Sequence, residues 1–302
     1  MKLDGKNVII TGATSGIGKE AAIEIAKKNP CIVLPVRNLE KGEQVKKQIV
    51  AESGNPSIYL MECDLASFDS IRDFAGEFKK RFSRLHLLIN NAGIWESKRS
   101  ETRDGIEMTF GVNHLATFLL TNLLLDEIRG GTPARIINVT SEAHRYTGMN
   151  FDDPEGKKKF SSFKAYGQSK LANILFTRYL AEMLREDGVT VHCMHPGFVA
   201  THLFDKIAPF LCPVFGLFMK TPRQGAETAV YLASSPEVDG STGGYYVNKK
   251  KKNPSRAALD DEAAKKLWEL SSEYTGHLSF VKTVNKPGFS LLSPKGVNGS
   301  FR

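Results

Sequence analysis

The residues in this chain best suited to chemistry are Tyr166 and Lys170, four positions apart in a stretch with helical apolar spacing. Four residues are slightly more than one helical turn, so the two side chains lie on one helix face. A phenol ionises near pH 10 in water, and lowering its pKa to about 7 requires roughly 4 kcal/mol. A partly buried ammonium group at roughly 4–5 Å can supply that energy. The pair therefore indicates proton transfer at an oxygen atom, although without further context such a pair is more often an exposed feature of a helix.

The elements that must position this pair alternate between strands and helices. Apolar runs predict strands at residues 7–11, 31–36, 57–62, 85–90, 135–140, 189–194 and 243–247. Helical spacing predicts helices between them, among others at residues 39–51, 68–82 and 105–128. Nearly continuous apolar strands alternating with helices indicate a parallel sheet covered on both faces. We predict an α/β protein with a single-domain, Rossmann-type, doubly wound parallel sheet of about seven strands and helices on both faces.

A glycine-rich turn, TGATSGIG, follows the first predicted strand. Glycines at this place allow backbone N–H groups to approach a phosphate at a helix N-terminus. Because the turn lies between a strand and an amphipathic helix, it predicts a dinucleotide site. The second predicted strand ends in VRN without a carboxylate for a ribose 2′-hydroxyl, and Arg37 can instead bind a 2′-phosphate. The sequence therefore favours NADP(H) over NAD(H); the alternative is that Arg37 is a solvated loop residue.

The spacing of the first two glycines, with three residues between them, resembles the short-chain dehydrogenase/reductase family. Further matches follow in order: CDL at residues 63–65, NNAG at 90–93, NVTS at 138–141, the YxxxK pair and PGFVAT at 196–201. The resemblance covers roughly residues 5–250. It implies a catalytic tetrad of Asn113, Ser141, Tyr166 and Lys170, in which Ser141 binds the substrate oxygen and Asn113 holds a water that links Lys170 to solvent.

The segment between Ser141 and Tyr166 is longer than the family usually has, since the two residues are 25 positions apart. It is polar, and we expect it to loop over the rim of the site. Thr140 also carries a hydroxyl but is a weaker candidate for the role of the serine. Trp95, which follows NNAG, has two open interpretations: it lines the pocket or it only covers the rim.

The resemblance also implies a set of cofactor-binding residues. Asp64 and Leu65 would flank the adenine, Asn91 and Gly93 the ribose, and Thr201 the nicotinamide carboxamide. The complete predicted set is Gly12, Thr14, Ser15, Gly16, Ile17, Gly18, Arg37, Asp64, Leu65, Asn91, Ala92, Gly93, Tyr166, Lys170, Pro196, Gly197, Val199 and Thr201. No metal site is predicted, because strand alternation puts His192 and Cys193 on opposite faces and favours packing roles.

The segment around residues 202–220 is rich in Leu, Phe and Ile, with few charges. We predict that it forms a lid for an apolar substrate; the alternative is a lid packed shut on the core. This lid, the long insert and the stretch ALDDEAAKKLWELSSEYTG resemble the retinol-dehydrogenase-like branch of the family. The resemblance implies a lipophilic alcohol, aldehyde or ketone such as a retinoid as substrate, and with NADPH it implies carbonyl reduction in the cell. A regulator that senses NADP(H) without turnover is the alternative, which the intact tetrad disfavours.

The charge and the cysteine content of the chain bear on its partners and its cellular compartment. The chain has 302 residues and a net charge of +8, partly from lysine runs at 157–159 and 249–252. We interpret these runs as solvated surface, with contact to a membrane surface as an alternative, and expect no nucleic-acid partner because no such binding module is visible. The cysteines form no CxxC pair, and the first strand begins too early for a leader segment. We predict a cytoplasmic protein with the oligomeric state open, a catalytic domain over residues 1–276 and a mobile tail over 277–302.

Overall fold

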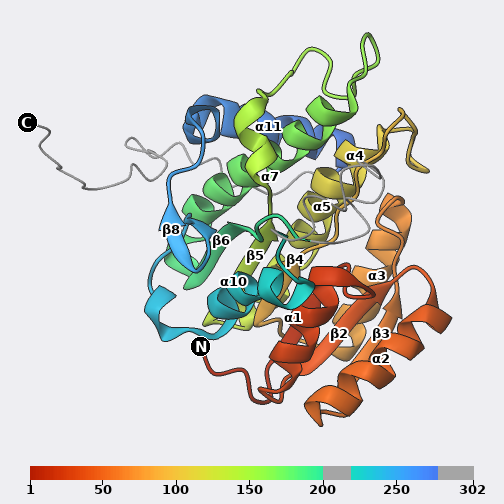
Figure 1. Cartoon of the computed structure of the whole chain (residues 1–302), viewed down its shortest axis with the longest axis vertical. Coiled ribbons are helices and arrows are strands. Elements are labelled where there is room, and N and C mark those ends of the chain that lie inside the picture. The colour runs from red at the N-terminus through yellow and green to blue at the C-terminus, as the bar shows by residue number, and fades with distance from the viewer. Residues whose placement is uncertain (200–218, 278–302) are drawn as a thin grey trace, which may run out of the picture.

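The computed structural model describes residues 1–199 and 219–277. Its central sheet has the strand order β3-β2-β1-β4-β5-β6-β7-β8 (Figure 1). Strands β1 to β7 run in parallel, and β8 pairs antiparallel with β7. The bounds are Asn7–Ile10 for β1, Cys31–Val36 for β2, Ile58–Glu62 for β3, Leu87–Asn90 for β4, Ala134–Val139 for β5, Val189–His195 for β6, Tyr245–Val247 for β7 and Lys250–Lys252 for β8. The order reverses between β1 and β4, which is where doubly wound sheets bind ligands.

The predicted fold class is confirmed, but the predicted number of strands is wrong, because the described residues form a sheet of eight strands and not about seven. The additional strand is β8, with the sequence KKK, which carries no alternating apolar pattern. Asn248 and Lys249 adopt φ values of 51° and 63° and turn the chain back beside β7. A two-residue turn with two positive φ angles is a common hairpin connection, and lysines are typical of an exposed edge strand.

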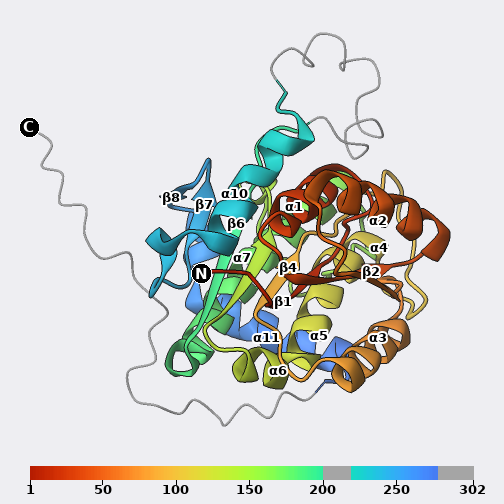
Figure 2. The ribbon, with the colours of Figure 1, turned by 90° about the horizontal axis from the view of Figure 1, so that it is seen from below.

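Helices cover both faces of the sheet (Figure 2). One face carries α1 (Gly16–Ala26), α2 (Leu39–Ser53) and α10 (Pro222–Ser234). The other carries α3 (Phe68–Arg81), α5 (Ala116–Leu123), α7 (Ser162–Met183) and α11 (Asp261–Thr275). Alternate residues of the strands supply the two apolar clusters: Ile9 and Leu88 pack with the second group, whereas Ile10 and Ile89 pack with the first. This two-sided burial explains the nearly continuous apolar strands.

The long helix predicted at residues 105–128 is interrupted. It consists of α4 (Met108–Phe110), a π-helical turn (Gly111–Leu115), α5 and α6 (Leu125–Gly130). The other described single turns are 3-10 helices at Glu142–Tyr146, Arg185–Asp187, Pro236–Val238 and Arg256–Leu259. Because Asn113 lies within the π-helical turn, the interruption falls at one of the candidate site residues.

Part of the predicted domain plan falls outside the described residues. The predicted lid is described only at Met219 and Lys220, and the predicted tail only at His277. Within the described residues, no helix is long and apolar enough to cross a membrane.

Candidate active site

Tyr166 and Lys170 lie on the first half of α7, both buried, with exposed fractions of 6% and 3%. The Lys170 Nζ lies 5.6 Å from the centre of the Tyr166 ring. It donates a hydrogen bond of 3.2 Å to the carbonyl oxygen of Val139, the last residue of β5. A Cβ atom on Gly93 would lie 3.0 Å from Nζ, so the turn after β4 passes directly beside the ammonium group. The spacing of four residues thus places phenol and ammonium together at the carboxyl edge of the sheet.

Ser141 is joined to Tyr166 by a hydrogen bond between their side chains. The serine follows β5, and its carbonyl accepts a bond of 2.6 Å from Nδ1 of His144, a ring that is fully buried. The other ring nitrogen of His144 accepts from the Ser255 backbone N–H at 3.0 Å, so His144 fixes the turn that presents Ser141. The Thr140 hydroxyl instead donates to the Lys170 carbonyl at 2.7 Å and is buried. Thr140 therefore anchors α7, and Ser141 is the hydroxyl that reaches the tyrosine.

Asn113 is fully buried and joins the π-helical turn to the loop after β4. Its Oδ1 accepts from the Ile94 N–H at 2.7 Å, and its Nδ2 donates to the Ile94 carbonyl at 2.9 Å. Its own backbone carbonyl accepts from Asn173 and Thr117 at 3.0 and 3.1 Å. Single π turns are frequent at functional sites, since they redirect a carbonyl out of the regular ladder. Here the turn lets Asn113 clamp the loop that borders Lys170.

The glycine-rich turn after β1 is held close to the NNAG turn after β4. Gly12 has a φ of 66°, and a Cβ there would lie 2.8 Å from the Ala92 Cα. A Cβ on Gly18 would lie 2.3 Å from Nδ2 of Asn91, which donates to the carbonyls of Thr11 and Gly12 at 2.9 and 3.2 Å. Asn91 therefore supports the glycine-rich turn, and only glycine fits at either position.

Comparisons with known proteins show the family of the chain. The family model for the short chain dehydrogenase matches residues 6–210. The chain belongs to the short-chain dehydrogenase/reductase family.

Retinol dehydrogenase 14 of Homo sapiens is 41% identical over 295 residues, which covers 91% of this chain and 88% of that protein. Retinol dehydrogenase 11 of Mus musculus is 40% identical over 278 residues with the same coverage of 91% and 88%. A crystal structure of an uncharacterized protein from Mycobacterium paratuberculosis superposes with a TM-score of 0.75 at 31% identity and covers 90% and 94% of the two chains. The chain is therefore a short-chain dehydrogenase of the retinol-dehydrogenase-like type, an oxidoreductase acting on CH–OH groups with a small-molecule substrate and a nicotinamide cofactor.

The turn before α1 fits the phosphates of the cofactor that this short-chain dehydrogenase requires. Ser15 is the N-cap of α1 but its side chain makes no capping bond, and the first turn contains no acidic residue. The first N–H groups of this helix have no intrahelical partner, and Gly12 and Gly16 in left-handed conformation shape the turn that precedes them. Thr14 and Ile17 complete the turn, both half-buried.

The remaining predicted cofactor residues border the same edge of the sheet. Arg37 follows β2 with an exposed side chain. Asp64 follows β3 and is held by Arg103 at 3.3 Å and by the Ala66 N–H at 3.1 Å, with Leu65 half-buried beside it. Val199 is buried, and a Cβ on Gly225 would meet its Cγ2 at 2.7 Å and the Ile17 Cγ1 at 3.1 Å.

Two other predicted residues, Pro196 and Gly197, follow β6 and are half-buried. A Cβ on Gly197 would lie 2.9 Å from the Lys220 Cδ. Thr201 lies outside the described residues.

The direction of the Tyr166 pKa differs from the sequence-based expectation. Burial raises the pKa of the phenol to about 12, although the hydrogen bond from Ser141 lowers it. Burial also lowers the pKa of Lys170 to about 8. Desolvation disfavours both charged forms, so the residues of the chain alone do not lower the pKa of the phenol towards 7. Lowering this pKa requires a positive charge in addition to those of the chain.

Sequence reasoning left the role of Trp95 open, and the structure places it in the site. Its ring stacks on that of Tyr166, with centroids 4.4 Å apart and an interplanar angle of 9°. Its Nε1 donates to the Ser162 Oγ at 2.5 Å, and this hydroxyl donates to the Glu96 carbonyl at 2.7 Å. No local pattern predicts this contact, because the two rings are 71 positions apart in the sequence.

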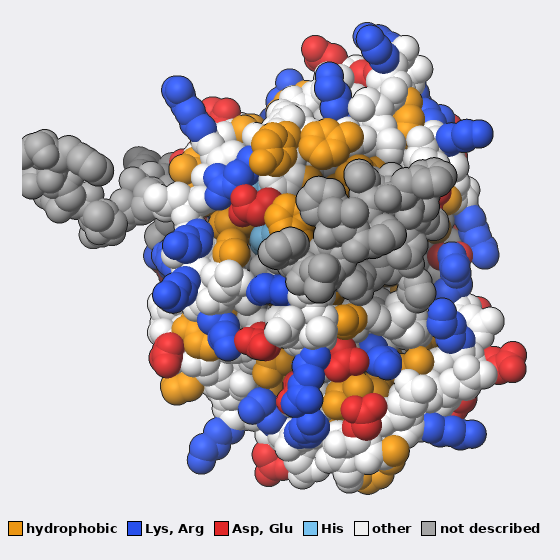
Figure 3. Space-filling model, in the orientation of Figure 1, with side chains coloured by type: hydrophobic (Ala, Val, Ile, Leu, Met, Phe, Trp, Pro, Cys, Tyr) orange, Lys and Arg blue, Asp and Glu red, His pale blue; other side chains and the backbone are white. Residues whose placement is uncertain are grey.

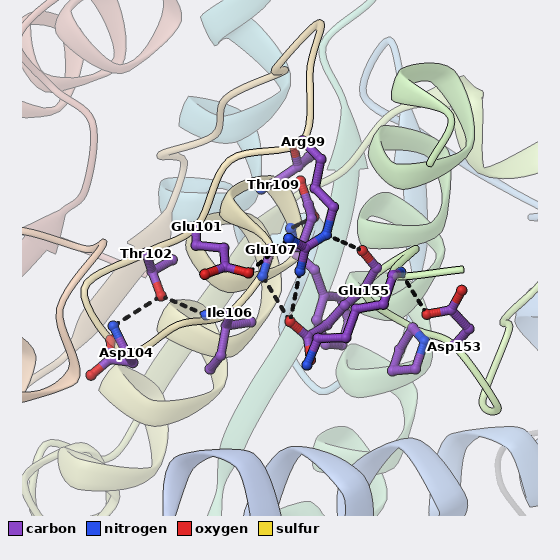
Figure 4. A network of polar contacts seen from close by, with 12 residues as sticks. Arg99, Glu101, Thr102, Asp104, Ile106, Glu107, Thr109, Asp153 and Glu155 are labelled. Atoms are coloured by element: carbon purple, nitrogen blue, oxygen red, sulfur yellow. Dashed lines mark hydrogen bonds and ion pairs between the residues drawn. The ribbon is translucent and has the colours of Figure 1, made fainter. Parts of the chain in front are cut away.

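A polar network that sequence reasoning missed fixes the insert between Ser141 and Tyr166 (Figure 4). Glu155 is buried, and its Oε2 accepts from the Glu107 N–H at 3.1 Å. Its carbonyl accepts from the Arg99 Nε at 3.3 Å, and its Oε1 accepts from the Tyr274 hydroxyl at 3.0 Å. The insert is thus tied to the loop after β4 and to α11.

The two histidines of VHCMH occupy packing positions. His192 is buried and its Nδ1 accepts from the Gly244 N–H at 3.2 Å, whereas His195 contacts Phe198. Burial lowers the pKa of each imidazole to about 4. Across residues 1–199 and 219–277, no group of three His, Cys, Asp or Glu side chains could hold a metal ion.

Proposed function

We propose that this short-chain dehydrogenase interconverts a lipophilic alcohol with its aldehyde or ketone, with NADP(H) as cofactor and reduction as the cellular direction. The observation that carries the proposal is the buried phenol of Tyr166, hydrogen-bonded to Ser141 and lying over Lys170 at the carboxyl edge of the sheet. Proton transfer by a phenol needs such a partner hydroxyl and a nearby positive charge.

In reduction, the Tyr166 hydroxyl donates its proton to the carbonyl oxygen of the substrate, and Ser141 donates a hydrogen bond to the same oxygen. The Lys170 ammonium stabilises the phenolate that remains, and Asn113 keeps the loop beside Lys170 in place. When bound, the nicotinamide cofactor supplies the hydride, and its oxidised form carries a positive charge. That charge adds to the charge of Lys170 and opposes the effect of burial on the phenol pKa.

The preference for NADP(H) rests on Arg37. This residue follows β2 where many dinucleotide folds hold the ribose with a carboxylate, and its guanidinium can bind a 2′-phosphate with paired hydrogen bonds. Arg37→Asp should shift the ratio of kcat/KM values towards NADH by at least tenfold, because a carboxylate repels the 2′-phosphate. An unchanged ratio would show that Arg37 does not bind it.

Two observations support the proposal of an apolar substrate. The sequence of residues 202–220 is rich in Leu, Phe and Ile, and the two curated relatives described above are named retinol dehydrogenases.

We propose one catalytic domain over residues 1–276, with residues 202–220 as lid and 277–302 as a mobile tail. We place the protein in the cytoplasm, with peripheral contact to a membrane surface through basic and apolar side chains; the free thiols of Cys31, Cys63 and Cys193 suit a reducing compartment.

Tyr166→Phe tests the assignment of the acid. The variant retains the ring and its stacking on Trp95, so it should bind NADPH as the wild type does and lose carbonyl reduction by at least a factor of about 100. Turnover is measured as NADPH consumption with retinaldehyde, medium-chain aldehydes, steroids and quinones, and cofactor binding by fluorescence titration. Tyr179→Phe, at the other end of the same helix, is the matched control and should leave turnover intact. Undiminished turnover in Tyr166→Phe would refute the proposal.

A further inference from the structure

A row of aromatic rings leads away from Tyr166. Trp95 stacks on Tyr166, Phe163 follows with its centroid 6.0 Å from that of Trp95, and Tyr146 follows at 6.2 Å from Phe163. We call Trp95, Phe163 and Tyr146 the aromatic row. Its members come from the loop after β4, the first turn of α7 and the 3-10 helix after β5. Three segments that are distant in sequence therefore build one continuous row of rings that begins at the ring of Tyr166.

The outer end of the aromatic row is open to solvent. Tyr146 is 73% exposed and Phe163 is 44% exposed, in contrast to 6% for Tyr166. Five large hydrophobic side chains are exposed in the described part of the chain, and two of them belong to this row. Figure 3 shows hydrophobic side chains at the surface in the upper part of the molecule, where α7 begins in Figure 1. Adjoining exposed rings at the rim of a site indicate a surface that binds an apolar ligand.

The row is held in place by polar contacts at its edges. Ser162 accepts from Trp95 and donates to the Glu96 carbonyl, which fixes the indole plane against Tyr166. The network around Glu155 ties the insert that follows Tyr146 to the loop that carries Trp95. A preorganised apolar wall binds a flexible tail at lower entropic cost than a mobile one.

Beyond the row lies a hollow within the insert. Tyr146 lines it together with Met149, Phe160, Lys164 and Gln168, and its volume is about 410 Å³. Its volume is within the range of small-molecule sites, but most of its other lining residues are polar or charged, among them Asn150, Asp153 and Lys159. The path from Tyr166 thus ends in a space rather than against packed side chains.

We propose that the aromatic row binds the tail of the substrate, which runs from Tyr166 across Trp95 and Phe163 towards Tyr146. The chain accordingly selects long or flat apolar carbonyl compounds, and the insert between Ser141 and Tyr166 determines how substrate length is recognised. This inference rests on the proposed function and adds the direction of the tail and the residues that contact it.

The test is the dependence of kcat/KM on chain length in the double variant Phe163→Ser/Tyr146→Ser of the full chain, with NADPH. The substrates are butanal, hexanal, octanal, decanal and retinaldehyde. In the wild type, each methylene that becomes buried should raise kcat/KM by about fourfold until the row is covered. In the double variant, the ratio of kcat/KM for decanal to that for butanal should fall at least tenfold. Tyr146→Phe keeps the ring and should keep the ratio.

Tyr59→Ser is the matched control, because Tyr59 is also 44% exposed but lies on β3, where it contacts Phe82. It should leave the length dependence unchanged. If the double variant reduces all aldehydes with the wild-type length dependence, the tail lies elsewhere and the inference is wrong, although the proposed function stands. If the wild type reduces no carbonyl compound, the proposed function itself is wrong and the inference falls with it.

Discussion

Gly18→Ala is the substitution whose effect the structure defines most sharply. A Cβ at this position would lie 2.3 Å from Nδ2 of Asn91 and 2.4 Å from the carbonyl oxygen of Gly12. Both distances are far below van der Waals contact, and one of the two atoms belongs to the backbone. The start of α1 must therefore move away from the Gly12 carbonyl, and the Asn91 amide must shift as well.

The energetic cost of Gly18→Ala follows from the hydrogen bonds that the added methyl group displaces. Asn91 donates two hydrogen bonds to backbone carbonyls of the glycine-rich turn, at 2.9 and 3.2 Å. Each such bond contributes about 0.5–1.5 kcal/mol net, and overpacking adds about 1–3 kcal/mol. We expect Gly18→Ala to lower the free energy of unfolding by about 2–6 kcal/mol and to weaken cofactor binding at least tenfold, because the displaced N–H groups no longer converge on the phosphates.

Thermal unfolding and NADPH titration by fluorescence measure the two effects. Gly76→Ala provides the control, since Gly76 lies in α3, is exposed, and a Cβ there would meet no atom within 4 Å. Alanine in a helix interior is favoured over glycine by up to about 1 kcal/mol, so this variant should be at least as stable as the wild type. If Gly18→Ala proves as stable as Gly76→Ala and binds NADPH equally well, the reasoning about the turn is refuted.

Two further predictions concern stability. Burial lowers the pKa of Lys170 from 10.5 to about 8, so between these values the unfolded chain binds a proton that the folded chain does not, and stability rises with pH across this window. Lys170→Met should therefore be more stable than the wild type by about 3 kcal/mol at pH 7, with the difference shrinking towards pH 10; a difference in urea unfolding that does not change with pH would contradict this. Glu155→Gln weakens the acceptor of the hydrogen bonds from Glu107 and Tyr274, and it should lower the free energy of unfolding by about 1–3 kcal/mol. The exposed Asp152→Asn in the same insert should change stability by no more than about 0.5 kcal/mol, and equal effects of the two changes would count against the role of Glu155.

Local patterns predicted those parts of the site that depend on neighbours in sequence. The spacing of Tyr166 and Lys170, and the glycine-rich turn between a strand and a helix, were sufficient to place both features at the carboxyl edge of the sheet. The structure brings Ser141 and Asn113 to the same place, as the resemblance implied.

The features that the sequence did not predict depend on tertiary contacts. The strand β8 forms because a turn with positive φ at Asn248 and Lys249 folds three lysines back onto β7, and composition does not indicate pairing. The raised pKa of Tyr166 follows from its burial, which helical spacing cannot show. Trp95 and Glu155 contact residues far away along the chain, so their roles required coordinates.

The most direct test of the account is the ionisation of the Tyr166 phenol itself. It is measured as the ultraviolet difference between the wild type and Tyr166→Phe during a pH titration, without cofactor and with NADP⁺ bound. We predict a pKa near the value of about 12 for the chain alone and a pKa well below 10 with NADP⁺, where Lys170 and the oxidised nicotinamide act together. A phenol that ionises at pH 10 or above with NADP⁺ bound would contradict the assignment of Tyr166 as the proton donor and acceptor.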